Sequence, residues 1–389
     1  MKSVFALTLL ITGLLVTDNP AAEKTNLILL LADDLSATAL SCYGGESVQT
    51  PVLDKLAAEG IRYTHCYSPA LCMPSRTELL TGKYSHRNYV GRGHLAPGET
   101  NIASKLKKAG YATCQVEKWH LNINKGAMPP DVGFDEYYHT KLSHNYENPR
   151  IDINGEEVDV PGGYGPKVCQ KYAFDFIARH KDQPFFLYYA IHLPHAPYHV
   201  PPGFDLGEKP SHQDKYFAMI EHMDAMVGEL VDYLDSLALR ERTLLVFLGD
   251  NGTPKGFRYR TNGRDLEGGK SSPLDSGTHV PMIVSWPGTA PTGVVTGNLV
   301  DFADFLPTAL ELAGENPRPA MKLDGRSFYR QLLGDPEAPV RDIAFKFGVK
   351  NGGKGAGPVN GYWARNQRWK LYYDGRLYDM EADPLEESP

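Results

Sequence analysis

Two pairs of oxygen-bearing side chains stand where apolar runs of the sequence end. Asp33 and Asp34 follow a nearly continuous apolar run, and Asp250 and Asn251 follow another. These side chains offer only oxygen ligands, a set that suits Ca²⁺ or Mg²⁺ and not zinc. Asp and Asn are also common in the turns that close strands, so either pair alone is ambiguous. Together, the two pairs predict a divalent-cation site.

A possible nucleophile, Cys72, begins the segment CMPSRTELLTG, residues 72–82. A Cys directly before a predicted helix would have a lowered thiol pKa, because helix N-termini stabilise anions. Arg76 would lie one helical turn beyond Cys72 and would face the same way. The residue types therefore predict a reactive sulfur beside a guanidinium group.

The elements that must position these residues alternate between strand and helix patterns. Strands are predicted from the apolar runs at 26–32, 185–191, 243–248 and 281–285, and helices at about 213–237 and 305–312. This alternation predicts an α/β fold with a large, mainly parallel sheet sandwiched by helices. In such a sheet, ligands bind at the carboxyl ends of the strands, which is where both acidic pairs fall.

The pattern changes near residue 316. Short strand-like segments at 343–347, 362–364 and 369–373 are joined by Gly-rich links, and they predict a small antiparallel sheet. We therefore expect a catalytic domain at 23–315 and a small C-terminal α+β subdomain at 316–389.

The N-terminus predicts export. An apolar run at 4–16 follows Lys2, and it is too short for a helix that spans a membrane. It is typical of a secretory signal, here assigned to residues 1–22, although a buried first strand or helix is an alternative. We expect a secreted or periplasmic protein with no stable membrane span.

The net charge of the sequence indicates which classes of partner to expect. The 389 residues carry a formal net charge of -7 and contain no long basic run, so nothing favours nucleic acid as a partner. A mildly acidic enzyme that acts on an anion must gather its positive side chains in one pocket. The cysteine count is five, and an odd count in an exported protein suggests one thiol with a separate fate.

Residues 72–82 resemble the signature of the sulfatase family, C-x-P-S-R followed by L-T-G, and match it at each fixed position. In sulfatases this Cys is converted to formylglycine, whose hydrated aldehyde is the nucleophile. The resemblance implies an alkaline-phosphatase-like fold. It also implies maturation of Cys72 by a formylglycine-generating enzyme or an anaerobic sulfatase-maturating enzyme.

The resemblance extends along the chain. The pairs at 33–34 and 250–251 are similar to the family's metal ligands, and the cation would also contact residue 72. Residues 117–121, EKWHL, are similar to the family's G-K-W-H-L, with Glu117 in place of the Gly. Residues 195–197, HAP, resemble the H-x-P element, and 377–380, LYDM, resemble a C-terminal L-Y-D-L motif.

The resemblance also implies roles for individual residues. Lys118, His195 and Lys270 would bind the sulfate group, and Arg76 would orient the hydrated aldehyde. His195 would protonate the leaving alcohol, and His120 would act as the base that frees the sulfate. If the segment is extended, Lys118 and His120 share a face. Lys270 falls where the family places a lysine, although the family's nearby E-G-G-x-R-x-P reads DSGTHVP at 275–281.

These expectations lead to one function and two alternatives. The chain is expected to hydrolyse a sulfate ester, with a sulfated carbohydrate or another sulfated small molecule as substrate and Ca²⁺, or else Mg²⁺, as cofactor. A phosphonate monoester or phosphodiester hydrolase would share the fold, the metal and in some cases the modified Cys. If Cys72 stays unmodified, the protein would be a non-catalytic binder of anions or glycans.

Overall fold

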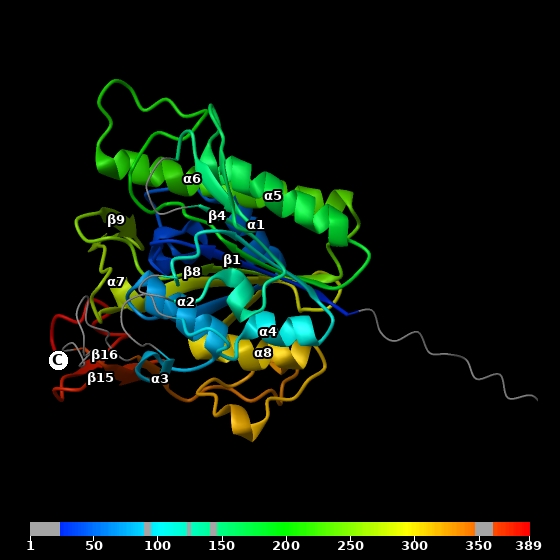
Figure 1. The fold of residues 1–389 in the computed structure, drawn as a ribbon. Helices are drawn as coiled ribbons and strands as arrows, with labels where there is room; N and C mark the ends of the chain where they lie inside the picture. The colour runs from blue at the N-terminus through cyan, green and yellow to red at the C-terminus, as the bar shows by residue number, and fades with distance from the viewer. Residues whose placement is uncertain (1–23, 89–94, 123–125, 141–145, 347–360) are drawn as a thin grey trace, which may run out of the picture.

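The computed structural model describes residues 24–88, 95–122, 126–140, 146–346 and 361–389, so the predicted secretion signal at 1–22 lies outside the described residues. A ten-stranded sheet forms the centre of the molecule (Figure 1). Its strands in spatial order are β12 (Val294–Asp301), β2 (Ile61–Tyr67), β11 (His279–Ser285), β8 (Thr243–Gly249), β1 (Asn26–Ala32), β7 (Phe185–Ala190), β3 (Ala112–Glu117), β4 (Glu136–Thr140), β5 (Arg150–Ile153) and β6 (Glu156–Asp159).

The sheet is mixed and mostly parallel, as predicted. β1 lies at its centre and pairs in parallel with both β7 and β8. β11 runs antiparallel to β8 and β2. Its direction is reversed because the chain after β8 passes through a hairpin, β9 (Arg258–Thr261) and β10 (Arg264–Glu267), and the short α7 (Asp275–Thr278). The chain then re-enters the sheet beside β8, at the end of the sheet where β8 finished, and so runs in the opposite direction.

Helices cover both faces of the sheet. One face carries α1 (Pro51–Glu59), α5 (Gly165–His180) and α6 (His212–Ser236); the other carries α2 (Cys72–Thr81), α4 (Ile102–Lys108) and α8 (Phe305–Leu312) (Figure 1). β1 feeds both layers, because alternate side chains of a strand point to opposite faces. Ile28 and Leu30 pack in the layer of α6, whereas Leu27 and Leu29 pack in the layer of α8.

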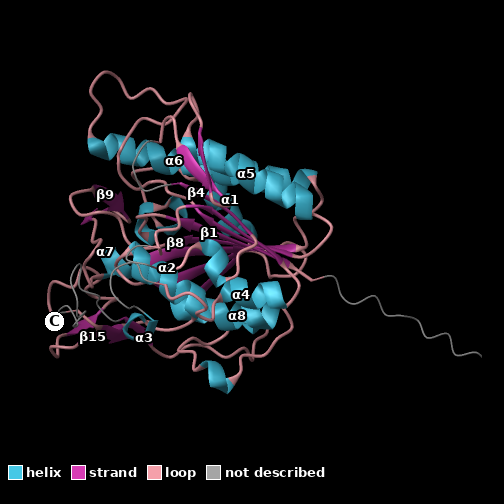
Figure 2. Ribbon diagram, in the orientation of Figure 1, coloured by secondary structure: helices cyan, strands magenta, loops and turns pink. Residues whose placement is uncertain are grey.

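A separate four-stranded antiparallel sheet lies near the C-terminus (Figure 2). Its strands are β13 (Ala344–Lys346), β14 (Trp363–Arg365), β15 (Trp369–Tyr372) and β16 (Leu377–Asp379). The buried Lys346 side chain joins this sheet to the rest of the molecule through ion pairs with Glu78 of α2 and Asp301 at the end of β12. The small sheet confirms the expected antiparallel element, and the domain boundary at residue 315 stays a prediction.

Short elements complete the fold: α3 (Ser85–Asn88), α9 (Tyr329–Leu332) and 3-10 turns at 37–39, 41–43, 129–132, 302–304 and 319–321. All five cysteines belong to the described residues and are free thiols. No helix of the described segments has the length and the apolar composition that crossing a bilayer requires.

Candidate active site

The two acidic strand ends lie side by side because β1 and β8 are neighbours in the sheet. Ala32, the last residue of β1, pairs with Gly249, the last residue of β8. The Asp34 backbone N–H donates to an Asp250 carboxylate oxygen at 3.0 Å, and the Asn251 side-chain amide donates to Asp34 at 2.8 Å. All four side chains predicted to bind a cation are buried. The parallel register therefore creates one compact group of oxygen ligands.

Cys72 lies against this group. Its sulfur and one carboxylate oxygen each of Asp33 and Asp250 lie within 4.8 Å of one another. Cys72 is the first residue of α2, so Arg76 on the next turn faces the same acids. The Arg76 guanidinium donates to Asp250 from Nε at 3.1 Å and from Nη2 at 2.9 Å. The predicted nucleophile position and the predicted cation ligands thus come together.

Lys118 and His120 reach the site from the segment that directly follows β3. This segment is not a regular strand. Glu117 has a φ of 74° and His120 a φ of 60°, both in the left-handed region. The Lys118 ammonium forms an ion pair with Asp33, and Nδ1 of His120 lies 3.6 Å from the Cys72 sulfur. Both side chains therefore face the site through left-handed turns, and not through the alternation of an extended chain.

His195 and Lys270 approach the second acid of the pair, Asp34, and His195 also lies near Asp33. Nζ of Lys270 is 2.5 Å from Oδ1 of Asp34, and Nε2 of His195 is 3.8 Å from Oδ2 of the same carboxylate. The His195 side chain is 27% exposed, whereas that of Lys118 is 0% exposed. His195 therefore lies where an entering substrate can touch it.

The thiol of Cys72 is not activated by its place at the start of a helix. Burial raises the pKa of Cys72, and the positive charge of Lys118 only partly offsets this effect, while Asp33 and Asp250 add to it. The lowered pKa that we predicted from the helix start is thus wrong, because burial favours the neutral thiol. A buried thiol of raised pKa is a poor nucleophile near neutral pH.

The pKa values of the neighbouring ionisable groups are shifted in opposite directions. Burial favours the neutral form of Asp33, but Lys118 and His195 hold the pKa of this carboxyl well below its usual range. Burial and the charge of Asp33 raise the pKa of Asp250 to about 7. Burial and the charge of Lys118 lower the pKa of His120 to about 2, so its ring is neutral at pH 7.

The residues at the two strand ends fit a hard divalent cation. Oδ1 of Asp33 and Oδ1 of Asn251 are buried, and neither has a hydrogen-bond partner among the described residues. Buried oxygens without donors are costly unless something positive compensates them, and carboxylate and amide oxygens are the ligands that Ca²⁺ and Mg²⁺ take. Arg76, Lys118 and Lys270 contact the same acids. The site therefore combines cation ligands with fixed positive side chains, as recognition of an anion requires.

Three further residues lie at the site without a role predicted from the sequence. Glu117 is buried, and Nε2 of His192 is 3.9 Å from Asp33. The Tyr146 hydroxyl donates to the His195 carbonyl at 2.6 Å across 49 positions of the chain. The departure from Gly at Glu117 was a usable signal in the sequence. No local pattern marked Tyr146, because its contact depends on the tertiary structure.

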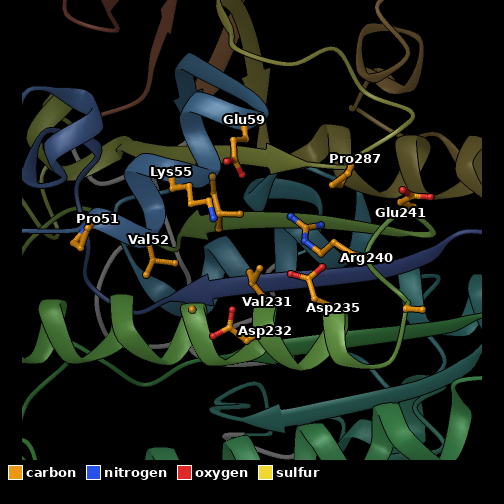
Figure 3. Close-up of a pocket in the computed structure, with 13 residues that line it drawn as sticks. Pro51, Val52, Lys55, Glu59, Val231, Asp232, Asp235, Arg240, Glu241 and Pro287 are labelled. Atoms are coloured by element: carbon orange, nitrogen blue, oxygen red, sulfur yellow. The ribbon is translucent and has the colours of Figure 1, made fainter.

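A hollow of about 720 Å³ elsewhere on the molecule is lined by α1, α6, the segment between α6 and β8, and Pro287 (Figure 3). Lys55, Glu59, Asp235 and Arg240 contribute to its lining. Arg240 precedes β8, whereas Asp250 follows it, so this hollow lies at the opposite end of the strand from the acidic cluster. None of the predicted catalytic residues lines it.

The fold and the site together define a hydrolase with an alkaline-phosphatase-like sheet. Residues 25–315 match the family described as Sulfatase. Arylsulfatase A of Homo sapiens is 34% identical over 364 residues, which cover 83% of this chain and 71% of that protein. N-acetylgalactosamine-6-sulfatase of Canis lupus familiaris is 32% identical over 353 residues, which cover 81% and 67%. The chain belongs to the sulfatase family and is a sulfuric ester hydrolase.

Solved structures agree with this fold. The structure of Ps i-CgsB in complex with k-i-k-neocarrahexaose has a TM-score of 0.80 at 27% identity and covers 94% of this chain and 88% of that one. A phosphonate monoester hydrolase of Agrobacterium radiobacter has a TM-score of 0.70 at 19% identity, covering 93% and 90%, and it shares the fold. Sulfatases generally use a formylglycine residue and a divalent metal ion.

Proposed function

We propose that this protein releases sulfate from a sulfated carbohydrate, with Cys72 matured to formylglycine and Ca²⁺, or else Mg²⁺, bound at the two acidic strand ends. The observation that carries the proposal is the convergence of Cys72 with Asp33 and Asp250, whose ligand atoms lie within 4.8 Å of one another. A maturation enzyme of the formylglycine-generating or the anaerobic sulfatase-maturating type would act on the chain during biosynthesis.

Two groups supply chemistry that the encoded side chains lack. A formylglycine hydrate at position 72 would offer one hydroxyl to attack sulfur and a second hydroxyl to drive release of the sulfate. The cation, held by Asp33, Asp34, Asp250 and Asn251 beside residue 72, would supply Lewis-acid charge to a sulfate oxygen. An unmodified Cys72 side chain carries no hydroxyl group that could expel the sulfate, so it would not serve in place of the hydrate.

The cationic side chains bind and orient the sulfate ester. Lys118 and Lys270 approach the acids from two different segments, so their ammonium groups would flank the three sulfate oxygens. Such preorganised charges stabilise the transition state more than they would in water, because the site is largely dry. Arg76 is tied to Asp250 and to the Lys118 carbonyl at 3.0 Å, and it would hold residue 72 in place.

Two histidines would move protons. The His195 side chain is 27% exposed, and it would donate a proton to the leaving alcohol oxygen. His120 lies beside position 72 and would take the proton from the second hydroxyl as sulfate leaves. Burial and Lys118 hold the pKa of its ring low, and the negative charge of a bound sulfate ester would raise that pKa. The two rings come from different segments of the chain, one after β3 and one after β7, which suits one acid step and one base step.

The substrate class is supported by relatives. One is named N-acetylgalactosamine-6-sulfatase, and one solved structure of 27% identity is a complex with k-i-k-neocarrahexaose. We therefore propose a sulfated sugar as substrate, met outside the cytoplasm after export through the signal at 1–22.

Co-expression with a maturation enzyme provides the test. Conversion of Cys72 lowers the mass of its peptide by about 18 Da, since SH is replaced by an aldehyde oxygen. The matured protein should then release sulfate from sugar sulfates and from an aryl sulfate. Faster hydrolysis of an aryl phosphonate would instead support the phosphonate hydrolase. An unmodified thiol in protein from the native host, with sugar binding and no turnover, would support the non-catalytic binder.

A further inference from the structure

The hydroxyl group of Tyr146 lies against the turn that carries His195. The hydroxyl donates to the His195 carbonyl at 2.6 Å, and the His192 carbonyl lies 3.3 Å from the same oxygen. The His192 carbonyl also accepts the His195 N–H at 2.9 Å, which closes the turn over residues 192–195. One side chain therefore contacts both ends of this turn.

The turn has a second anchor at the first acid of the site. The Leu193 carbonyl accepts the Asp33 N–H at 3.1 Å. Nδ1 of His195 lies 2.7 Å from the Ala196 carbonyl, and Nε2 lies 3.8 Å from Oδ2 of Asp34. Asp33 therefore holds the middle of the turn, whereas the imidazole ring that faces the acids belongs to its far end.

The Tyr146 side chain is itself held in place. The residue is 8% exposed, and its ring stacks on His199 with centroids 4.1 Å apart and 25° between the planes. A second ring contact joins it to His192 at 5.5 Å. Its backbone carbonyl accepts the N–H of Gly165, the first residue of α5, at 2.6 Å. A side chain that is locked by packing in this way can hold a catalytic group in a defined geometry.

The Tyr146 hydroxyl stays protonated over the physiological pH range. Burial raises the pKa of Tyr146 well above its usual range, and the negative charges of Glu117 and Asp33 raise it further. A protonated phenol can donate to a carbonyl oxygen, whereas a phenolate cannot. The hydrogen bond to the His195 carbonyl therefore persists at any pH at which the protein would work.

We propose that Tyr146 is a positioning residue whose hydroxyl holds the His195 end of the turn, so that His195 can protonate the leaving group. The inference rests on the proposed sulfatase function. Tyr146 lies outside the segments that resemble family motifs, so the resemblance assigns it no role. The ring packs and the hydroxyl holds the turn, so Tyr146→Phe removes the second role and keeps the first.

Two probes of the matured protein separate positioning from a merely structural role. The leaving group of 4-nitrophenyl sulfate departs without a proton, whereas the sugar alcohol of N-acetylgalactosamine 6-sulfate requires one. For Tyr146→Phe we expect kcat to fall about tenfold or more on the sugar sulfate, and to change by less than about threefold on the aryl sulfate. Normal turnover of the aryl sulfate also shows that the variant is folded.

Tyr164→Phe is the matched control. The Tyr164 hydroxyl pairs with Nε2 of His199 at 2.9 Å, outside the turn, and its ring stacks on that of Tyr146 with centroids 6.2 Å apart. This change removes a buried hydroxyl from the same group of rings and leaves the turn untouched. Turnover of both probes should therefore stay within about threefold of the wild type.

His195→Ala should show the same selective loss as Tyr146→Phe. The double variant should be no worse than His195→Ala, because the tyrosine acts only through this histidine. Equal losses of Tyr146→Phe on both probes, additive losses in the double variant, full activity on the sugar sulfate, or an equal selective loss in Tyr164→Phe would overturn the inference. If the matured wild type releases sulfate from neither probe, the proposed function fails and the positioning role falls with it; an active wild type confines a failure to the positioning role.

Discussion

The sulfur of Cys72 lies 3.6 Å from Nδ1 of His120, although the two residues are 48 positions apart in the chain. One residue begins α2 and the other follows β3, so two separate crossovers of the sheet deliver them to one point. The contact brings a neutral imidazole to the position where the attacking group forms. The first prediction therefore concerns the chemistry of residue 72.

Replacing Cys72 with Ser should give a protein that is sulfated once and then stops. Serine has a single hydroxyl, so its sulfate ester lacks the second hydroxyl that would expel sulfate. Intact mass after incubation with an aryl sulfate should show the covalent adduct. Cys66→Ser, at a buried free thiol of β2, is the control and should turn over normally. Steady multiple turnover by Cys72→Ser would refute the second-hydroxyl mechanism.

Removal of divalent metal should lower the unfolding temperature of the folded protein. A cation that binds only the native state stabilises it by about 2.7 kcal/mol at 100 times its dissociation constant. Thermal unfolding in chelator, and then with excess Ca²⁺ or Mg²⁺, measures the shift and ranks the two ions. Asp33→Asn should abolish most of the shift, whereas Glu59→Gln, in the hollow behind β8, should keep it. An identical melting curve with and without metal would contradict the cation site.

Lys346→Ala should destabilise the junction between the two sheets. The Lys346 ammonium is 2.7 Å from Asp301 and also pairs with Glu78, and all three side chains are at most 3% exposed. Removing it leaves two buried carboxylates unpaired, which costs about 3–5 kcal/mol. Urea unfolding measures this loss.

Arg150→Ala is the matched control, because it breaks an exposed pair with Asp159 whose side chains are 55% and 61% exposed. Such pairs contribute at most about 1 kcal/mol. Equal effects of the Lys346 and Arg150 replacements would show that the buried network does not hold the small sheet in place.

His65 should make the protein sensitive to acid. Burial, the neighbouring His279 and the Arg365 guanidinium lower the pKa of His65 from 6.5 to about 4. The unfolded chain therefore takes up a proton, as pH falls below 6.5, that the folded chain does not. The stability contributed by this group is present above pH 6.5 and is lost as pH falls towards 4, at most about 3 kcal/mol.

His65→Asn should flatten the decline in unfolding free energy between pH 6.5 and pH 4. Urea unfolding at a series of pH values provides the measurement. His212→Asn, at an exposed position at the start of α6, should leave the slope unchanged. A slope that is the same in wild type and His65→Asn would assign the acid sensitivity to other groups.

Much of the fold could be predicted because its signals are local. The apolar run at 26–32 predicted β1, and the helical pattern at 305–312 predicted α8; both elements have these bounds. A strand buried on both faces must be apolar throughout, and this leaves a clear pattern in the sequence. The reversed direction of β11 was not predicted, because strand direction depends on how the intervening segment returns to the sheet.

The sequence by itself determined the chemical inventory: oxygen ligands at two strand ends, the 72–82 segment that marks the family, and a few lysines and histidines spread between positions 118 and 270. The tertiary structure alone decided which of them meet. The parallel register of β1 and β8 joins the acids, α2 brings Cys72 and Arg76 to them, and left-handed turns at Glu117 and His120 direct Lys118 and His120 into the site. Register, burial and backbone strain arise from contacts between distant segments, and no local pattern encodes them.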